Sequence, residues 1–356
     1  MVKKFPLSSF KKWLFISVLF TFSNAFSANF YVNDNSTAGD VYCTAVGDDT
    51  NNGTSPATPK LTLNAAYAAA APGDTIFIDT GTYTGSGNVS LIFNKSITIK
   101  GAGTLKTIFT SHTDDRFGTI SANDVHIEGL QLFDFFLETS STVLGQVILV
   151  NSNITGFELT NVVMKKNYGS TNDGASIHLS SGSSSTFKGL FFSCSGFNGG
   201  SGGAVKINAA TLNLKNSVFS QSRDAAGYGG ALDIIGASNV IIDKCTFDGN
   251  SAYAGGAIAQ FGGSLAVTNS CFNRNYISGD SSANTNGGGH YYSTGTITSA
   301  SFTNCKFEGA YFCATTNPSG YPCQYSTNVS NDGNAISIRG AAGNFTFDTC
   351  DFNNSN

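Results

Sequence analysis

The sequence predicts an all-β protein, a right-handed single-stranded parallel β-helix (solenoid) with a short N-terminal capping helix. Two recurring strings carry this prediction. The string Gly-x-[Ala/Ser]-apolar begins at Gly174, Gly202, Gly229, Gly255 and Gly333, with a degenerate copy at Gly288. The string apolar-x-x-[Cys/Ser/apolar]-x-[Phe/apolar] ends at Leu132, Met164, Phe192, Phe219, Phe247, Phe272, Phe307 and Phe352.

The spacings between successive copies of the two strings change together. Successive starts of the first lie 28, 27, 26, 33 and 45 residues apart. From Met164 onward, the ends of the second lie 28, 27, 28, 25, 35 and 45 residues apart. Patterns that lengthen and shorten together belong to one structural repeat, and a period of about 20 to 50 residues is typical of solenoids.

Composition narrows the functional class. Charged residues make up 12% of the 356 residues and apolar residues 40%, with a net charge of −4. Disordered chains combine high charge with low hydrophobicity, so a folded body is expected. No cluster of Lys and Arg follows the N-terminal segment, and nucleic-acid binding therefore lacks its usual basic footprint.

Residues 1–27 are typical of a secretory signal peptide. Lys3, Lys4, Lys11 and Lys12 precede the apolar run Trp13–Phe22. Ala25 and Ser27 then offer the small residues of a cleavage site after Ser27. The alternative is an uncleaved anchor, although the apolar run is short for a membrane span. We expect a mature chain without a transmembrane segment, secreted or held at the cell surface.

Residues 29–110 are expected to form an N-terminal cap and the first coils. Phe30–Val32, Asp74–Asp79, Val89–Phe93 and Ser96–Lys100 have strand patterns, and Asp34–Pro59 is a polar loop. The Ala-rich segment Leu61–Ala71 has one apolar helical face and ends before Pro72-Gly73. An amphipathic helix at this position would cover the apolar end and the strand edges of the stack.

Residues 111–356 are expected to be β-helix repeats, and either the chain is truncated at the C-terminus or a partner covers that end. If the coils stack directly, Phe219, Phe247, Phe272, Phe307 and Phe352 form a ladder of inward rings. Asn161, Asn216, Asn269 and Asn304 precede the inward Cys/Ser/apolar position, where Asn tolerates a left-handed bend. The two long intervals predict loops around Ser278–Gly287 and Gly309–Asn331, which are places where a solenoid carries function.

The cysteines fit an oxidising compartment without requiring one. Cys245, Cys305 and Cys350 share one register position and are expected to be buried thiols. Cys313 and Cys323 bracket part of an expected loop, and we predict a disulfide between them. No Cys/His spacing indicates zinc, so no metal ligands are assigned.

The head of the chain resembles a known superfamily. Tyr31-Val32, Gly47–Thr54, Pro59, Leu61, Ala71–Ile76 and Gly81–Tyr83 resemble the opening segment of secreted right-handed β-helix proteins of the pectate-lyase-like superfamily. The resemblance covers about 55 residues and implies the fold. It leaves function open, because that superfamily contains polysaccharide lyases, hydrolases and non-catalytic surface proteins.

The repeats carry a second, partial resemblance. Gly255–Ile258, with Phe247–Asn250 and Phe272–Asn275, is similar to the GGAI and FxxN repeats of polymorphic outer-membrane adhesins. Ser222, Ala310 and Ser355 stand where that pattern has Asn. The resemblance implies an adhesin-like surface role.

One position brings together residues with catalytic potential. The residue after the apolar member of the Gly-led string is His178, Lys206 and Asp233 on three successive coils, followed by Ala259, Tyr292 and Ser337. Equivalent positions on neighbouring coils lie side by side, so a base, an ammonium and a carboxylate would meet. The alternative is a solvated face carrying a Lys–Asp cross-strand pair.

Two function classes remain open. The first is a non-catalytic secreted or cell-surface module that binds polysaccharide or a host or cell-surface protein through tyrosines expected to be exposed in the insertions: Tyr276, Tyr291, Tyr292, Tyr311, Tyr321 and Tyr325. The alternative is a polysaccharide lyase or glycoside hydrolase that acts on acidic polysaccharide with His178, Lys206 and Asp233. No cofactor is required, although Asp48–Asn52 could supply oxygen ligands to Ca²⁺.

Overall fold

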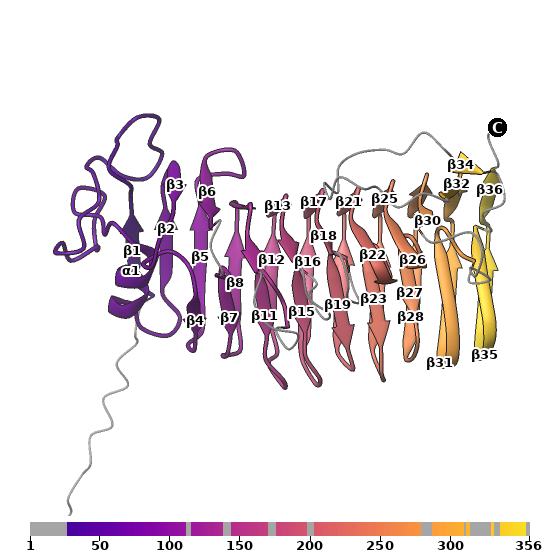
Figure 1. Cartoon of the computed structure of the whole chain (residues 1–356). Coiled ribbons are helices and arrows are strands. Elements are labelled where there is room, and N and C mark those ends of the chain that lie inside the picture. Colours follow the sequence, from indigo (N-terminus) through magenta and orange to yellow (C-terminus); the bar gives the residue numbers. More distant parts are fainter. Residues whose placement is uncertain are drawn as a thin grey trace, which may run out of the picture.

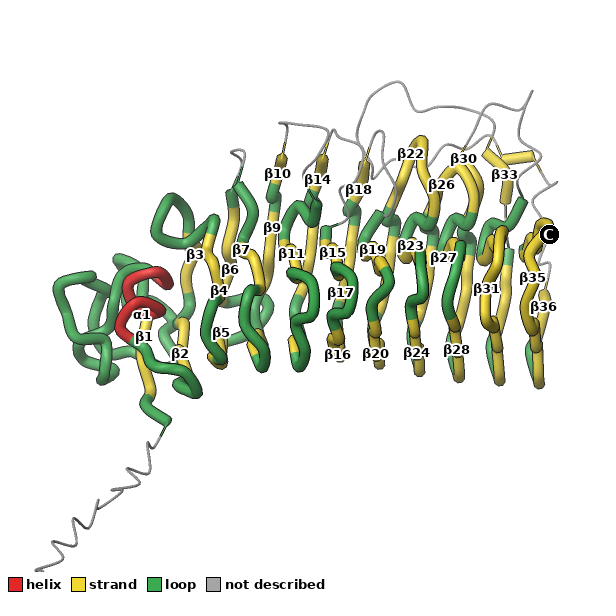
Figure 2. The backbone as a smooth tube through the Cα atoms, turned by 90° about the horizontal axis from the view of Figure 1, so that it is seen from below, coloured by secondary structure: helices red, strands yellow, loops and turns green. Residues whose placement is uncertain are grey.

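A computed structural model describes residues 27–111, 115–137, 144–169, 176–197, 203–278, 287–309, 311–313, 329–330 and 335–353. The described chain is a right-handed parallel β-helix whose coils lie side by side along one axis (Figure 1). Its single described helix, α1 (Leu63–Ala69), lies at the N-terminal end of the stack (Figure 2). The predicted fold class is confirmed.

The strands build three sheets called A, B and C, and the described coils from β7 to β33 run through four strand positions. Sheet A has two columns, A1 and A2, which join in the last two coils. Column A1 contains β4 (Leu91–Phe93), β7 (Gly118–Ile120), β11 (Ile148–Val150), β15 (Ile177–Leu179), β19 (Val205–Asn208), β23 (Leu232–Ile235), β27 (Ile258–Gln260) and the first parts of β31 (Tyr291–Thr303) and β35 (Ile336–Asp348). Column A2 contains β1 (Asn29–Val32), β2 (Thr75–Ile78), β5 (Ile97–Gly101), β8 (Val125–Glu128), β12 (Phe157–Thr160), β16 (Ser184–Lys188), β20 (Thr211–Lys215), β24 (Asn239–Asp243), β28 (Ser264–Thr268) and the second parts of β31 and β35.

Sheets B and C complete the coils. Sheet B contains β3 (Gly81–Tyr83), β6 (Thr107–Thr110), β9 (Gln131–Phe133), β13 (Val163–Lys165), β17 (Phe191–Ser193), β21 (Val218–Ser220), β25 (Thr246–Asp248), β29 (Cys271–Asn273), β32 (Lys306–Glu308) and β36 (Asp351–Asn353). Sheet C contains β10 (Phe136–Leu137), β14 (Tyr168–Gly169), β18 (Gly196–Phe197), β22 (Arg223–Tyr228), β26 (Ser251–Ala254), β30 (Tyr276–Ser278), β33 (Tyr311–Cys313) and β34 (Val329–Ser330). Among the described strands, every pairing is parallel except that of β33 with β34.

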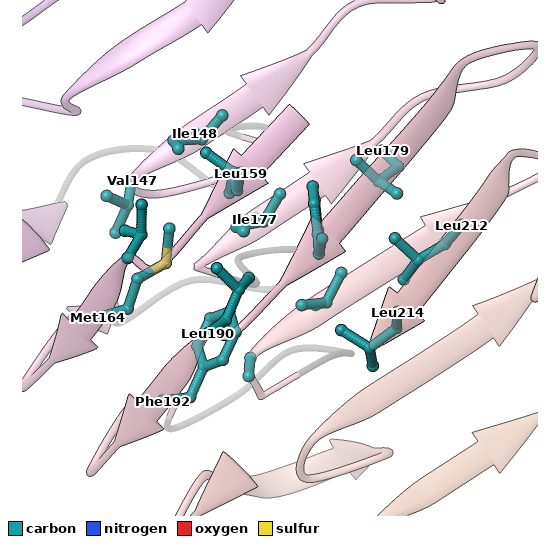
Figure 3. Close-up of a cluster of buried hydrophobic side chains, with 14 of the residues drawn as sticks. Val147, Ile148, Leu159, Met164, Ile177, Leu179, Leu190, Phe192, Leu212 and Leu214 are labelled. Carbon is teal, nitrogen blue, oxygen red and sulfur yellow. The ribbon is translucent and has the colours of Figure 1, made fainter. Parts of the chain in front are cut away.

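The interior is built from stacked apolar side chains, as the repeats predicted. Phe219, Phe247 and Phe272 are fully buried, and their rings stack at centroid distances of 5.2 and 4.9 Å. The stack continues through Phe307 to Phe352 at 4.8 Å per step. Aliphatic side chains of columns A1 and A2 fill the space beside the sheet B residues Met164 and Phe192 (Figure 3). The predicted phenylalanine ladder is therefore confirmed.

From β8 onward, a two-residue turn joins each A2 strand to sheet B. Its first residue has a left-handed backbone, with φ of 50° at Asn161 and Asn216 and 52° at Asn269 and Asn304. Asn tolerates this conformation better than most residues do. The Asn304 side-chain amide also donates to Asn269 Oδ1 at 2.8 Å on the preceding coil. The structural role predicted for these asparagines is confirmed.

The Gly-led string marks the point where the chain returns from sheet C to column A1. Its first Gly turns the chain, with φ of +66° at Gly229 and +65° at Gly255. At the second position, a Cβ on Gly230 would lie only 2.3 Å from the carbonyl oxygen of Gly256. Coils approach too closely there for any side chain, and the repeated glycine pairs satisfy both constraints.

The predicted capping helix is present and shorter than expected. Thr62 is its N-cap, and its hydroxyl oxygen accepts a hydrogen bond from the Ala65 N–H at 3.2 Å. Leu63, Ala66 and Tyr67 are buried against the first coils, where the Tyr67 ring meets Phe93 edge-on at 5.5 Å. The predicted apolar face therefore packs as expected.

Buried polar residues also form ladders inside the stack. Cys245 and Cys305 are buried free thiols, and Cys350, also free, is half-buried below them. At the following turn, Asn250 donates to Asn275 Oδ1 at 2.9 Å. The FxxN positions of the sequence are therefore inward-facing asparagines. Asn275 in turn contacts the buried His290 Nδ1 at 3.0 Å.

Candidate functional site

The outward residues of column A1 align as the sequence predicted. His178 pairs in register with Lys206, and Lys206 with Asp233. The column continues through Ala259, Tyr292 and Ser337. We call the residues from His178 to Ser337 the outer A1 column. Strand alternation points them away from the core that Ile177, Val205 and Leu232 fill from the same strands.

The environment of this column differs from the solvated face considered as the alternative. His178 and Asp233 are each 1% exposed, and Lys206 is 6% exposed. The Lys206 Nζ lies 3.9 Å from Asp233 Oδ2, so the cross-strand pair exists but is buried. A solvated face was the wrong expectation. Both faces of the A1 strands are covered here, as the burial of all three residues of β15 shows.

An aromatic cluster, absent from the sequence-based prediction, covers the next coils. Tyr292 is buried, and Tyr228, Tyr253 and Phe261 are half-buried against it and against Ala259. The Tyr228 ring stacks on Tyr292 at 6.2 Å and 15°. Tyr253 and Phe261 meet the Tyr228 ring edge-on, at 5.9 and 4.8 Å. We call these four residues the aromatic platform.

The platform gathers from three parts of the coil. Tyr228 ends β22, the six-residue strand of sheet C, and pairs in register with Ala254. The register shifts between Asp224 and Tyr228, where Asp224 Oδ1 accepts a hydrogen bond from the Gly227 N–H at 2.7 Å. This bulge and the left-handed turn at Gly229 bring Tyr228 over column A1. Phe261 directly follows β27, and Tyr292 belongs to β31.

The outer A1 column and the platform share Tyr292, and Asp233 lies two coils before it in the column. The pKa of Tyr228 is raised, first by burial and then by repulsion between its ionised form and Tyr292, Tyr253 and Asp233. A tyrosine phenol is protonated at neutral pH at its ordinary pKa, and this raised pKa extends the pH range in which Tyr228 keeps its O–H donor. The buried carboxylate of Asp233 acts electrostatically on the platform, while Lys206 balances its charge from the preceding coil.

This arrangement is better suited to binding than to proton transfer. A general base must come within hydrogen-bond reach of the substrate proton. The 1% exposure of Asp233 leaves little surface for such contact. In contrast, the half-buried rings of Tyr228, Tyr253 and Phe261 offer accessible apolar surface beside phenol hydroxyls.

The tyrosines predicted to bind ligand differ in burial and in whether the structure describes them. Tyr291 and Tyr292 are buried rather than exposed, so that expectation was wrong. Tyr291 takes the inward position of the Gly-led string, where its O–H donates to Gln260 Oε1 at 2.7 Å. Tyr311 lies in β33, whereas Tyr321 and Tyr325 lie outside the described residues. The exposed-tyrosine hypothesis for these three stays a prediction.

The proposed bridge between Cys313 and Cys323 also stays a prediction. Cys313 ends β33, and Cys323 lies outside the described residues. The segments expected as insertions, Ser278–Gly287 and Gly309–Asn331, are described only at Ser278, Gly287, Gly309, 311–313 and 329–330.

The loop considered for Ca²⁺ is held by its own polar groups. Asp48 Oδ1 accepts from the Thr50 N–H at 2.8 Å, and Asp49 Oδ1 accepts from the N–H groups of Leu61 and Thr62. These bonds order the polar loop against the start of α1. Calcium binding there stays a prediction.

No described helix is long and apolar enough to pass through a membrane. In the described part of the chain, no three His, Cys, Asp or Glu side chains are grouped as ligands of a metal ion.

Comparison with protein-family models and with curated protein sequences finds no match. Solved structures give matches that are broad in coverage and low in similarity. A lacto-N-biosidase from Eubacterium ramulus has a TM-score of 0.44 at 8% identity, over 92% of this chain and 68% of that one. A rhamnogalacturonan lyase has a TM-score of 0.41 at 13% identity, over 89% and 88%. A pectin methylesterase from Erwinia chrysanthemi has a TM-score of 0.35 at 14% identity, over 81% of each chain.

The sequence contained a usable signal for the platform. Tyr228 directly precedes the first Gly of its string, and Tyr253 stands two residues before Gly255. Aromatic residues just before the glycine turn on two successive coils should lie close together, although Tyr228 pairs in register with Ala254 and Tyr253 is offset by one residue. The changing length of the preceding segment hides this alignment.

Proposed function

We propose that this protein is a non-catalytic polysaccharide-binding β-helix, exported from the cell, which holds sugar residues on its aromatic platform. The observation that carries the proposal is the half-buried group of Tyr228, Tyr253 and Phe261 around the buried Tyr292. Clustered apolar surface on an otherwise polar protein marks an interaction site. The leader-like residues 1–27 support export.

The chemistry of the platform suits a sugar. Aromatic rings cover the C–H face of a pyranose, while phenol hydroxyls can bond to its O–H groups. Tyr292 is already packed beneath the other rings, so little side-chain freedom would be lost on binding. The rigid coils behind it keep the rings at fixed separations.

Binding to polysaccharide tests the proposal. We expect Tyr253→Ala to weaken binding at least about tenfold, as loss of an aromatic anchor does. Phe191→Ala is the matched control, since that ring is 40% exposed on the outer face of sheet B, away from the platform. Affinity electrophoresis against a panel of plant, algal and microbial polysaccharides gives the readout. Equal retardation of both variants and the wild type would refute the platform as the binding site.

The enzymatic alternative has one observation in its favour, the in-register alignment of His178, Lys206 and Asp233. A lyase would use a base and a cation beside a uronate. Its assay is the ultraviolet absorbance of unsaturated products from pectate or alginate, with and without Ca²⁺. Activity that disappears in Lys206→Ala and Asp233→Asn, with circular dichroism unchanged, would establish the enzyme and displace our proposal.

A further inference from the structure

We infer that the platform selects uncharged sugar residues and discriminates against uronates. This inference rests on the proposed function, because it concerns the ligand of the same site. It depends on the charges that lie beneath and beside the four rings.

The cation of the outer A1 column, Lys206, is already matched by a carboxylate. The Lys206 Nζ lies 3.9 Å from Asp233 Oδ2, and both side chains are almost completely buried. A uronate carboxylate arriving at the platform would have to compete with Asp233 for this ammonium. Displacing one partner of a buried pair leaves the other uncompensated, which is strongly unfavourable.

The carboxylate also lies on the side of the pair that faces the platform. Asp233 precedes Ala259 and Tyr292 in the outer A1 column, and Lys206 is one coil farther away. The field of Asp233 reaches the Tyr228 hydroxyl, where it opposes ionisation of the phenol. The same field would repel a second carboxylate held by that hydroxyl.

Of the other described charges near the platform, Arg223 and Asp224 offset each other, and Arg339, one coil from Tyr292, is tested by substitution below. Arg223 and Asp224 are adjacent on β22 and carry opposite charges, and Asp224 is fully buried. Arg339 is exposed on β35, where it pairs in register with Thr294 rather than with Tyr292. Along the outer A1 column, the charge nearest to the platform is therefore the Asp233 carboxylate, and the Lys206–Asp233 pair carries no net charge.

Matched ligands make the test sharp. Highly methyl-esterified and de-esterified homogalacturonan share a backbone and differ in charge, as do unsubstituted xylan and glucuronoxylan. We expect the wild-type protein to bind the uncharged member at least about tenfold more tightly, with little change between low and high salt. The ratio of the two affinities is the measured quantity, so a general loss of binding in a variant does not confound it.

Two substitutions test the stated cause. Asp233→Asn removes the carboxylate and leaves the ammonium, and we expect it to shift the ratio toward the charged member at least threefold. Lys206→Met combined with Asp233→Leu removes both charges, and we expect a much smaller shift. Arg339→Gln should leave the ratio unchanged.

The outcomes separate the two proposals. Tyr253-dependent binding that favours the charged member in the wild type, or a ratio unaltered in Asp233→Asn, overturns the inference and leaves the proposed function standing. Loss of charged-member binding in Arg339→Gln also overturns it, because a uronate would then be held by that guanidinium. Absence of Tyr253-dependent binding to either member removes the proposed function and the inference with it.

Discussion

Truncation of one ring in the phenylalanine ladder should destabilise the whole stack. In Phe247→Ala, the removed ring is fully buried between Phe219 and Phe272, with centroids 5.2 and 4.9 Å away and planes within 11°. The coils above and below are fixed by parallel strand pairing, so the cavity has little means of collapsing.

The magnitude follows from two contributions. A buried Phe→Ala substitution lowers the free energy of unfolding by about 3–5 kcal/mol. Loss of each aromatic pair contributes about 0.5–1.5 kcal/mol to such a decrease. Because two stacked pairs disappear together, we expect a value near the top of the range, about 4–5 kcal/mol. Phe352→Ala should cost much less, since that ring is 50% exposed at the far end of the ladder.

Urea unfolding followed by far-ultraviolet circular dichroism measures the effect. Phe191→Ala is the internal control, because its exposed ring neighbours Phe192 on the same strand, and it should change stability by less than about 1 kcal/mol. A solenoid couples mainly neighbouring repeats, so we expect Phe247→Ala also to split the unfolding transition into two steps. If Phe247→Ala were no more destabilising than Phe191→Ala, the ladder would not be the main source of cohesion between coils.

Three further predictions concern single sites. Asp233→Ala should lower the free energy of unfolding in urea by about 3–5 kcal/mol, because it leaves the buried Lys206 ammonium without its carboxylate. Lys206→Met combined with Asp233→Leu should stay within about 1 kcal/mol of wild type. Equal losses in the two variants would contradict the buried pair. Gly230→Ala should reduce the unfolding midpoint more than Gly85→Ala, since a Cβ on Gly230 meets backbone oxygens at 2.3 and 2.5 Å. A Cβ on Gly85 meets open space, so Ala there carries only the cost of the left-handed backbone at φ +78°, about 1–2 kcal/mol. Similar midpoints would argue against close coil contact. Burial lowers the pKa of His290 from 6.5 to about 3, so the unfolded chain takes up the proton first. The free energy of unfolding should therefore fall as pH drops from 6.5 toward 3, by up to about 1.4 kcal/mol per pH unit. His290→Gln should flatten this dependence in urea titrations between pH 7 and 4.5, and an unchanged slope would refute the prediction.

The sequence predicted the stack well because every coil repeats the same constraints. The glycine turn, the left-handed asparagine and the inward ring recur with few substitutions. Phe247 and Phe272, for example, each end a copy of the second string, and the two rings pair in register. The register then follows directly, including the alignment of His178, Lys206 and Asp233.

Burial on the outer face was harder to predict, because it depends on segments that do not repeat. Strand alternation predicts that the Asp233 side chain points away from the core, but nothing in its own string distinguishes a covered outer face from an open one. Tyr291 illustrates a different error. Its place in the Gly-led string already indicated an inward side chain, yet its position next to a long loop suggested exposure.

The two-residue turn between column A2 and sheet B has a further consequence. It keeps the same length from Glu128–Gln131 to Asp348–Asp351, whereas the return from sheet B to column A1 grows from 9 intervening residues after Asp248 to 27 after Glu308. One corner of the molecule is thus fixed by geometry, and the opposite flank absorbs insertions. New recognition loops can accumulate on that flank over evolution, or be grafted there by design, while the scaffold beneath them keeps its pitch.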